Sequence, residues 1–356
     1  MSALARFSNI FRRRGVRAGL LLLVCLGLIG ALAAACGDSS DSDRPGDTLQ
    51  MTYMGGFVPQ SNLPFVAVYV AEDQGFFADE GLEVDIQHAG FTGSHKSLIL
   101  AGEIDITTLP ASEMLEVRAN SGAPYVAVML FGQRGDFGYA VLNSSGIESP
   151  ADFAGRNVGY KGIVQSEFHA MLAAHNLTTA DMNMIDVGFN PVVLVEQQVD
   201  VYPVFLSNEP DTLSRNLNQD ISVFEAADYG VPTLGVVYLV TEEFLQDETN
   251  REKLTRFLRA TVRAFEFSVD DPAAAIESTE KFLAEDPPPD LVHERFILDT
   301  EIANALSDLT RANGVGWFTQ QQFRALADVL FDYGALENPI DVESAIDRSF
   351  LEDIHR

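Results

Sequence analysis

Short apolar runs and longer amphipathic runs alternate along the chain from residue 49 onward. The runs 49–54, 81–86 and 104–109 have the length and the two-residue period of strands, and the runs 62–77 and 94–101 between them have the period of helices. A helix that joins two neighbouring strands brings them side by side in parallel, as a βαβ unit. The first part of the chain is therefore predicted to be an α/β lobe on a parallel sheet.

The same alternation recurs further along, with strands and helices expected in turn over 157–160, 166–175, 184–189, 192–197 and 199–204. The two copies agree best between residues 100–106 (LAGEIDI) and 195–201 (VEQQVDV). In both, a helix passes through a polar turn into a strand that has Asp at its second position. Two such lobes would place a cleft between the carboxyl ends of their strands.

Beyond residue 240 the pattern is helical, with helices expected over 251–269, 272–283, 289–306 and 319–333. We expect these helices to pack on the first lobe, so that the chain crosses between the lobes near residues 138 and 234. The first lobe then consists of residues 49–138 and 235–356, and the second lobe of residues 139–234.

The first 35 residues have the three parts of a secretory signal: five arginines without an acid, an apolar run over 20–35, and small residues before Cys36. The apolar run is shorter than the roughly 20 residues that a transmembrane helix needs. The small residues and Cys36 resemble the lipobox of bacterial lipoproteins, although Ala33 stands where that motif usually has Leu. The resemblance implies a lipid on Cys36 that anchors the chain at the extracytoplasmic face of a cell membrane. Residues 36–48, rich in Asp, Ser and Gly, are expected to be a flexible tether.

Cysteine usage and charge exclude several classes of function. Cys25 leaves with the signal, so Cys36 is the one cysteine of the mature chain, and a disulfide within the chain or thiol catalysis is excluded. The histidine spacings place no two imidazoles on one helical face, which argues against a metal site. With 23 basic and 52 acidic residues the chain has a formal net charge of −29. Nucleic acid and anionic lipid headgroups are therefore not expected partners.

Seven segments carry a family resemblance: VPQ (58–60), YVAEDQGFF (69–77), EGLEV (80–84), AGEID (101–105), SPADFAG (149–155), SNEP (207–210) and DYGVP (228–232). They resemble the periplasmic substrate-binding proteins of ABC importers, in the branch that includes binders of alkanesulfonates, thiamine pyrimidine precursors and riboflavin. The resemblance implies a type II, two-lobed α/β clamshell, each lobe a parallel-rich sheet flanked by helices. Such a monomer closes on a small molecule, without a cofactor, and delivers it to a membrane permease with its ATPase.

An enzyme shares this fold, the eukaryotic pyrimidine-precursor synthase, whose chemistry is associated with a cysteine-rich iron motif and a histidine in the first-lobe helix. The mature chain has no spare cysteine, and Phe65 stands near the histidine position. The motifs G-x-S-x-G and H-E-x-x-H and a phosphate loop are also missing. We therefore expect a binding protein and no catalysis. A sensory or adhesion lipoprotein is a further class that the sequence leaves open.

Ligand contacts are expected in loops at the carboxyl ends of strands. The candidates in the first lobe are Phe57, Gln60, Asn62, Phe65, Phe91, Ser112 and Gln133, and those in the second lobe are Tyr160, Tyr202, Asn208, Glu209 and Tyr229. Aromatic rings there could stack on a flat ligand while amides bind its edge. The resemblance suggests that Glu209 accepts hydrogen bonds from the ligand. Structural roles are the alternative: Phe65 in the core, Glu209 as an exposed turn residue.

A cleft with many aromatic rings, amides and one acid suits a flat, neutral heterocycle. An alkanesulfonate or nitrate-type anion would need paired cationic donors, yet Lys96 and Lys161 are the only lysines before residue 250. A binder of a thiamine pyrimidine precursor would favour Trp at the place of Phe57. The many phenylalanines favour riboflavin, which is the predicted ligand, with a formylaminopyrimidine-type precursor as the alternative.

Overall fold

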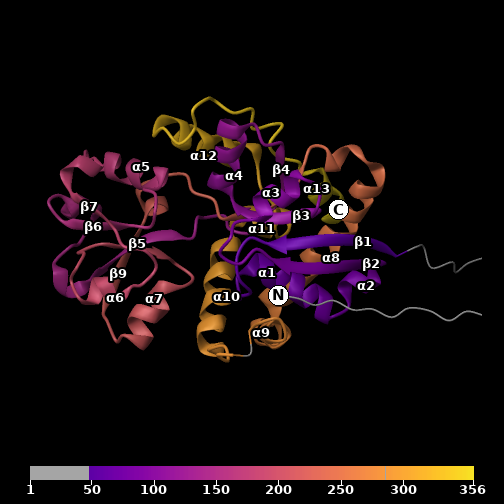
Figure 1. Cartoon of the computed structure of the whole chain (residues 1–356), viewed down its shortest axis with the longest axis horizontal. Helices are drawn as coiled ribbons and strands as arrows, with labels where there is room; N and C mark the ends of the chain where they lie inside the picture. The colour runs from indigo at the N-terminus through magenta and orange to yellow at the C-terminus, as the bar shows by residue number, and fades with distance from the viewer. Residues whose placement is uncertain (1–47, 285) are drawn as a thin grey trace, which may run out of the picture. The chain divides into compact units, whose positions relative to one another are not determined.

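The computed structural model describes residues 48–284 and 286–356 (Figure 1). The predicted signal, the lipidated Cys36 and the tether fall within residues 1–47 and so lie outside the described residues. The described residues belong to one compact unit. In these two ranges, no helix combines the length and the apolar character that crossing a membrane requires.

The larger sheet has five strands in the order β2-β1-β3-β10-β4. They are β1 (Leu49–Gly55), β2 (Leu82–His88), β3 (Ile106–Pro110), β4 (Tyr125–Leu130) and β10 (Val236–Thr241). Strand β1 runs parallel to both β2 and β3, as the predicted βαβ units require, and Figure 1 shows β1 and β2 side by side. Strand β10 is antiparallel to β3 and β4.

Helices α1 (Leu63–Asp73), α2 (Phe76–Asp79), α3 (His95–Leu100) and α4 (Ala111–Ser121) connect these strands. The sequence predicts one helix over 62–77, but the helix is broken at Gly75. This glycine has a φ of 76°, a left-handed conformation that a residue with a Cβ adopts at a cost. Nearly all of α1 is buried because it packs against α8 and α9 as well as α2.

The middle of the chain forms two smaller sheets, of order β8-β5-β9 and β6-β7. Their strands are β5 (Phe137–Leu142), β6 (Asn157–Tyr160), β7 (Asn183–Asp186), β8 (Tyr202–Phe205) and β9 (Ile221–Glu225). Strands β6 and β7 are parallel, whereas β5 is antiparallel to both β8 and β9. The helices here are α5 (Ser166–Ala174), α6 (Val192–Val195), α7 (Glu209–Asp211) and a π-helical turn, η4 (Thr212–Asn216).

The C-terminal part of the chain is helical, as predicted, over α8 (Glu248–Asp270), α9 (Pro272–Glu280), α10 (Leu291–Ala305), α11 (Asp308–Asn313), α12 (Gln320–Asp332) and α13 (Ser349–Ile354). Capping residues fix several of the helix starts. Asp247 accepts hydrogen bonds from two backbone N–H groups of α8, and Asp290 does the same for α10. Short 3-10 turns occupy 143–145, 150–153, 179–181, 226–229 and 244–246.

The buried apolar residues divide into separate cores. The core of the larger sheet draws on residues 51–131 and 234–351, and the two smaller cores draw on residues 139–231. On this basis we propose that residues 49–138 with 235–356 and residues 139–234 are the two lobes, the boundaries that the sequence predicts.

The two segments that cross between these lobes lie against each other. Gly235 N donates to Gly132 O at 2.9 Å, and Gly135 N donates to Thr233 Oγ1 at 3.0 Å. A Cβ on Gly235 would lie 2.7 Å from Gly132 Cα, closer than real Cβ atoms come to a backbone. Glycine is therefore needed at this crossing because the two backbones touch.

Candidate functional site

Two exposed phenylalanines lie together at the carboxyl end of the larger sheet. Phe57 follows β1 and is 37% exposed, and Phe91 follows β2 and is 83% exposed. Their ring centroids are 4.9 Å apart with planes at 84°, an edge-to-face pair. Both were predicted as ligand contacts. Because their aromatic surface is not used in the core, it is free to contact a ligand.

Two further exposed phenylalanines hold matching places in the second lobe. Phe189 follows β7 and is 71% exposed, and Phe205 ends β8 and is 37% exposed. Neither residue was predicted from the sequence as a ligand contact, although each stands at a strand end, where such contacts were expected. The ring of Phe205 also packs edge-to-face on Phe137 at 5.6 Å.

Lys161, Tyr202 and Glu209 form a buried polar group between these two phenylalanines. Lys161 and Glu209 make an ion pair, and Glu209 Oε2 also accepts a hydrogen bond from Phe205 N at 2.8 Å. Tyr202 is fully buried, and its hydroxyl donates to Gly188 O at 3.2 Å. The predicted contact Glu209 is therefore already paired within the protein, and it is not the exposed turn residue of the alternative.

The loop after β1 is tied to helix α10. Asn62 Nδ2 and Leu63 N both donate to the carboxylate of Glu301, and Ser61 N donates to Glu294 Oε2 at 2.9 Å. Phe65, one turn into α1, is buried. Its ring meets His88 edge-to-face at 5.4 Å, so Phe65 has the core role that was the alternative to ligand binding.

Two acids near this loop hold their protons unusually tightly. Asp136, in the first crossing segment, accepts hydrogen bonds from Ser207 N at 3.0 Å and Ser207 Oγ at 2.6 Å. Burial raises the pKa of Asp136 to about 7 against these hydrogen bonds, which lower it. Burial, then the nearby Asp136, raises the pKa of Glu301 to about 8. At neutral pH, Glu301 is therefore largely protonated, and Asp136 keeps its proton to a higher pH than an ordinary aspartate does.

Several buried polar atoms have no hydrogen-bond partner among the described residues. They include Ser61 Oγ, Asn62 Oδ1, both ring nitrogens of His95, and Glu167 Oε2. Such atoms are costly unless a partner arrives. Burial, helped by Lys96, lowers the pKa of His95, so this imidazole is neutral at pH 7 and offers one donor and one acceptor. These groups lie at the starts of α1, α3 and α5, which is why we add Ser61, His95 and Glu167 to the candidate contacts.

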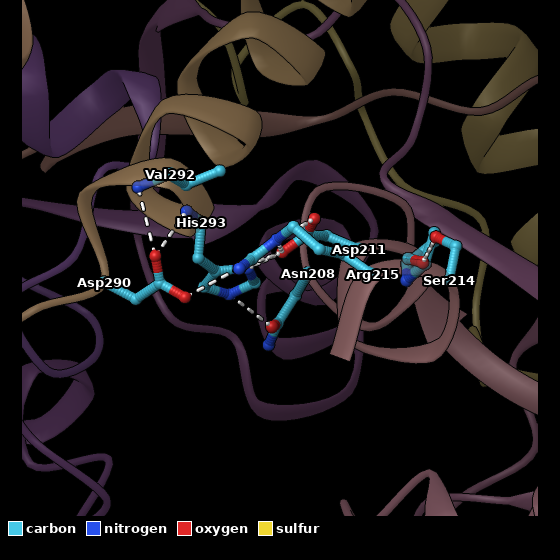
Figure 2. Close-up of polar contacts among 8 residues, drawn as sticks. Asn208, Asp211, Ser214, Arg215, Asp290, Val292 and His293 are labelled. Atoms are coloured by element: carbon cyan, nitrogen blue, oxygen red, sulfur yellow. Dashed lines mark hydrogen bonds and ion pairs between the residues drawn. The ribbon is translucent and has the colours of Figure 1, made fainter. Parts of the chain in front are cut away.

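A polar network joins the second lobe to helix α10 (Figure 2). His293 Nδ1 lies 2.7 Å from Asp211 Oδ2, and His293 Nε2 lies 3.1 Å from Asn208 Oδ1. Arg215 donates to Asp211 at 2.9 and 2.8 Å and to Asp290 at 2.7 Å. Arg215, then His293, lowers the pKa of Asp211. The predicted contact Asn208 thus takes part in a connection between the lobes.

The remaining predicted contacts lie at different places. Gln60 is half-buried in the loop after β1, Tyr160 is half-buried at the end of β6, and Ser112 is half-buried at the start of α4. Gln133 uses both amide atoms within the protein, donating to Trp317 O at 2.8 Å and accepting from Gln322 Nε2 at 3.0 Å. The ring of Tyr229 packs on His175 at 5.0 Å.

Two of the cavities in the described part of the chain have no predicted contact in their lining. The larger, of about 480 Å³, lies near the C-terminus beside Trp317 and His355. The smaller, of about 210 Å³, lies between α4, α5 and the end of α12. One of its walls is Glu116, whose pKa burial and the neighbouring Glu167 raise to about 7.

The arrangement of sheets and helices defines a periplasmic binding protein fold. The sulfonate-binding protein SsuA from Methylobacillus flagellatus KT has the same fold, with a TM-score of 0.63 and 14% identity over 86% of this chain and 94% of that chain. This likeness confirms the predicted α/β class.

The model of the family described as "NMT1/THI5 like" matches residues 62–275, and the chain belongs to that family. Riboflavin-binding protein RibY of Chloroflexus aurantiacus is 26% identical over 345 residues, 95% of this chain and 96% of that protein. The formylaminopyrimidine-binding protein of Halalkalibacterium halodurans is 30% identical over 59% of this chain and 64% of that protein. A 4-amino-5-hydroxymethyl-2-methylpyrimidine phosphate synthase of Aspergillus parasiticus is 23% identical over 59% of this chain and 64% of that protein. The family predicted from the seven sequence segments is thereby confirmed.

Proposed function

We propose that this chain is the ligand-binding component of an ABC importer and that its lobes close on a flat, neutral aromatic heterocycle, riboflavin before other candidates. The observation that carries the proposal is the set of exposed phenylalanines at strand ends in both lobes: Phe57, Phe91, Phe189 and Phe205. Gathered exposed rings are typical of binding surfaces, and flat heterocycles stack on them. The similarity to RibY along nearly the whole chain supports riboflavin.

Hydrogen bonding to the ligand is assigned to the buried polar atoms without a partner in the described protein. Ser61 and Asn62 in the loop after β1, and His95 at the start of α3, supply both donors and acceptors. A neutral heterocycle with a polyhydroxylated chain has groups of both kinds. A sulfonate would instead need several cationic or N–H donors directed at one point.

The test is a titration of riboflavin with the purified protein, in which binding is monitored by the quenching of flavin fluorescence when the flavin stacks on aromatic rings. We expect binding in the micromolar range or tighter. Removing one ring, by Phe57→Ala or Phe189→Ala, should cost about 0.5–1.5 kcal/mol, or roughly two- to twelvefold in Kd. Phe331→Ala is the matched control because Phe331 is also exposed but lies within helix α12 and does not follow a strand.

A formylaminopyrimidine is the second candidate ligand, supported by the 30% identical binding protein. A single pyrimidine ring covers less aromatic surface than three fused rings, so it should depend on fewer of the four phenylalanines. Unquenched riboflavin together with a thermal shift by a formylaminopyrimidine would reverse the order of the two ligands. No response to either would overturn the proposal of a heterocycle binder.

We propose further that the chain binds its ligand without turnover. Because a synthase is among the relatives, turnover should be measured directly. Riboflavin incubated with the protein should be recovered unchanged by chromatography, and any conversion that depends on the protein would assign it to the enzymes.

We also propose that a lipid on Cys36 holds the binding domain at the outer face of the membrane beside its permease. A tether of this kind raises the effective concentration of the domain at the permease. Cys36→Ser should move the protein from the membrane fraction to the soluble fraction. Cys25→Ser, in the expected signal, is the matched control and should leave the fractionation unchanged.

A further inference from the structure

A buried cation lies in the second lobe beside the exposed rings. Lys161 directly follows β6, and the next residue, Gly162, has a φ of 72°, so the chain turns there and Lys161 pairs with Ile163 in a short antiparallel bridge. The turn directs Lys161 to Glu209, and the two side chains are only 4% and 5% exposed. A pair this well shielded from water has a fixed geometry and is screened little by salt.

Three aromatic rings surround the same ammonium. Lys161 Nζ lies 5.4 Å from the ring centroid of Phe189, 5.1 Å from that of Tyr202 and 4.7 Å from that of Phe205. All three distances are within the range of cation–π attraction, about 6 Å. The hydrogen bond from Tyr202 to Gly188 O holds the loop that carries Phe189. The hydrogen bond from Phe205 N to Glu209 places the carboxylate at the cage.

Three rings and a carboxylate are the groups with which proteins bind organic ammonium ions. In this chain the ammonium belongs to the protein. We propose that Lys161 is a built-in occupant of an organic-cation site, and that it determines the charge specificity of the second lobe. A cationic ligand would have to displace Lys161 from Glu209 and would add a second positive charge to the cage. A neutral ring can use the outer faces of Phe189 and Phe205 without disturbing the pair.

This inference rests on the proposed function only where it assigns Phe189 and Phe205 to ligand binding; the cage itself is independent of that assignment. Burial lowers the pKa of Lys161, whereas Glu209 raises it, so the ion pair offsets part of the cost of the buried charge. Removing the lysine side chain should therefore leave a cavity with a strong demand for a cation.

The experiment is chemical rescue of Lys161→Ala. The atoms removed are Cγ, Cδ, Cε and Nζ, which are the heavy atoms of n-propylammonium. We expect n-propylammonium to raise the Tm of Lys161→Ala by several degrees. Equal concentrations of 1-propanol, which has a hydroxyl in place of the ammonium, or of sodium chloride should not. The wild type should show no cation-specific shift.

Matched variants separate a cage from an ordinary ion pair. Lys96→Ala removes the partner of Glu113 from a more exposed pair and should show no rescue. Adding Glu209→Gln to Lys161→Ala should abolish the rescue, and adding Phe189→Ala should weaken it at least twofold. Full rescue in both double variants, Lys161→Ala with Glu209→Gln and Lys161→Ala with Phe189→Ala, would overturn the assignment of the cage.

If Lys161→Ala does not fold without an added cation, the same probes are tested by refolding the variant from urea and measuring the fraction of folded protein recovered. Recovery with n-propylammonium and not with 1-propanol supports the cation site. Equal recovery with both, or recovery with neither, overturns it. Because the probes are not heterocycles, the outcome does not depend on whether riboflavin binds.

Discussion

Glu301→Gln is expected to gain stability relative to the wild type as the pH rises from about 5 to about 9. Glu301 is only partly buried as a residue, but its carboxylate is enclosed, where it accepts hydrogen bonds from Asn62 Nδ2 and Leu63 N. Burial, then Asp136, raises its pKa to about 8. Glutamine has nearly the same shape, keeps one oxygen acceptor, and cannot ionise.

The magnitude follows from linkage between protonation and folding. A carboxyl whose pKa is raised on folding binds its proton more tightly in the folded chain, so the free energy of unfolding falls as pH rises from the unfolded pKa to the folded pKa. For Glu301 this window runs from 4.5 to about 8. At about 1.36 kcal/mol per pH unit, the full loss is on the order of 5 kcal/mol. This is an upper value that is not added to the loss from Asp136, because Asp136 itself contributes to the raised pKa of Glu301.

The measurement is urea unfolding of the wild type and of Glu301→Gln at several pH values from about 5 to about 9, with circular dichroism as the readout. The variant should gain stability over the wild type as pH rises, by roughly 2–5 kcal/mol at the alkaline end. Glu248→Gln, at an exposed position of α8, controls for the loss of one negative charge from an acidic chain. A difference between Glu301→Gln and the wild type that is the same at both ends of the pH range would refute the reasoning.

Three further substitutions test the crossing, the lobe contact and the unpartnered groups. Gly235→Ala places a Cβ 2.7 Å from Gly132 Cα and should cost about 1–3 kcal/mol in urea unfolding, more than Gly135→Ala, whose Cβ would meet a threonine side chain at 3.1 Å. His293→Ala removes contacts to the second lobe that contribute about 1–1.5 kcal/mol, so it should weaken riboflavin binding roughly five- to twelvefold. An unchanged Kd would show that the network does not stabilise the bound form. His95→Leu should raise the Tm while lowering riboflavin affinity, because it removes a buried imidazole that has no partner among the described residues; a loss of both would mean that the ring is structural.

Periodicity is enough to predict the α/β class, but it does not find every strand. The parallel start of the sheet is visible because β1 and β2 alternate and are separated by helices that end at glycines. Strand β4 was not predicted. Both of its faces are buried, so its sequence, YVAVML, is apolar throughout and has no period that separates a strand from a helix. Strand β5 (FGYAVL) was missed for the same reason, because five of its six residues are buried and no polar residue alternates with them.

At the candidate site, contacts at strand ends could be predicted from the local sequence, whereas a contact between distant elements could not. The strand-end rule led to Phe57 and Phe91, and applied without exception it would have led to Phe189 and Phe205 as well. The role of Glu209 could not be predicted in this way. Its partner Lys161 lies 48 residues earlier, and an ion pair between distant elements leaves no pattern in either local sequence.

Charge at the candidate site is reduced in two different ways. Lys161 neutralises Glu209 by pairing, while Glu301 and in part Asp136 are neutralised by retaining a proton. Both mechanisms operate at neutral pH in a chain with a formal net charge of −29. If the surface around the ligand had the negative charge of the whole chain, its unpaired carboxylates would attract cationic ligands. The local neutralisation removes that preference, and the exposed phenylalanine rings are then left as the groups that select the ligand.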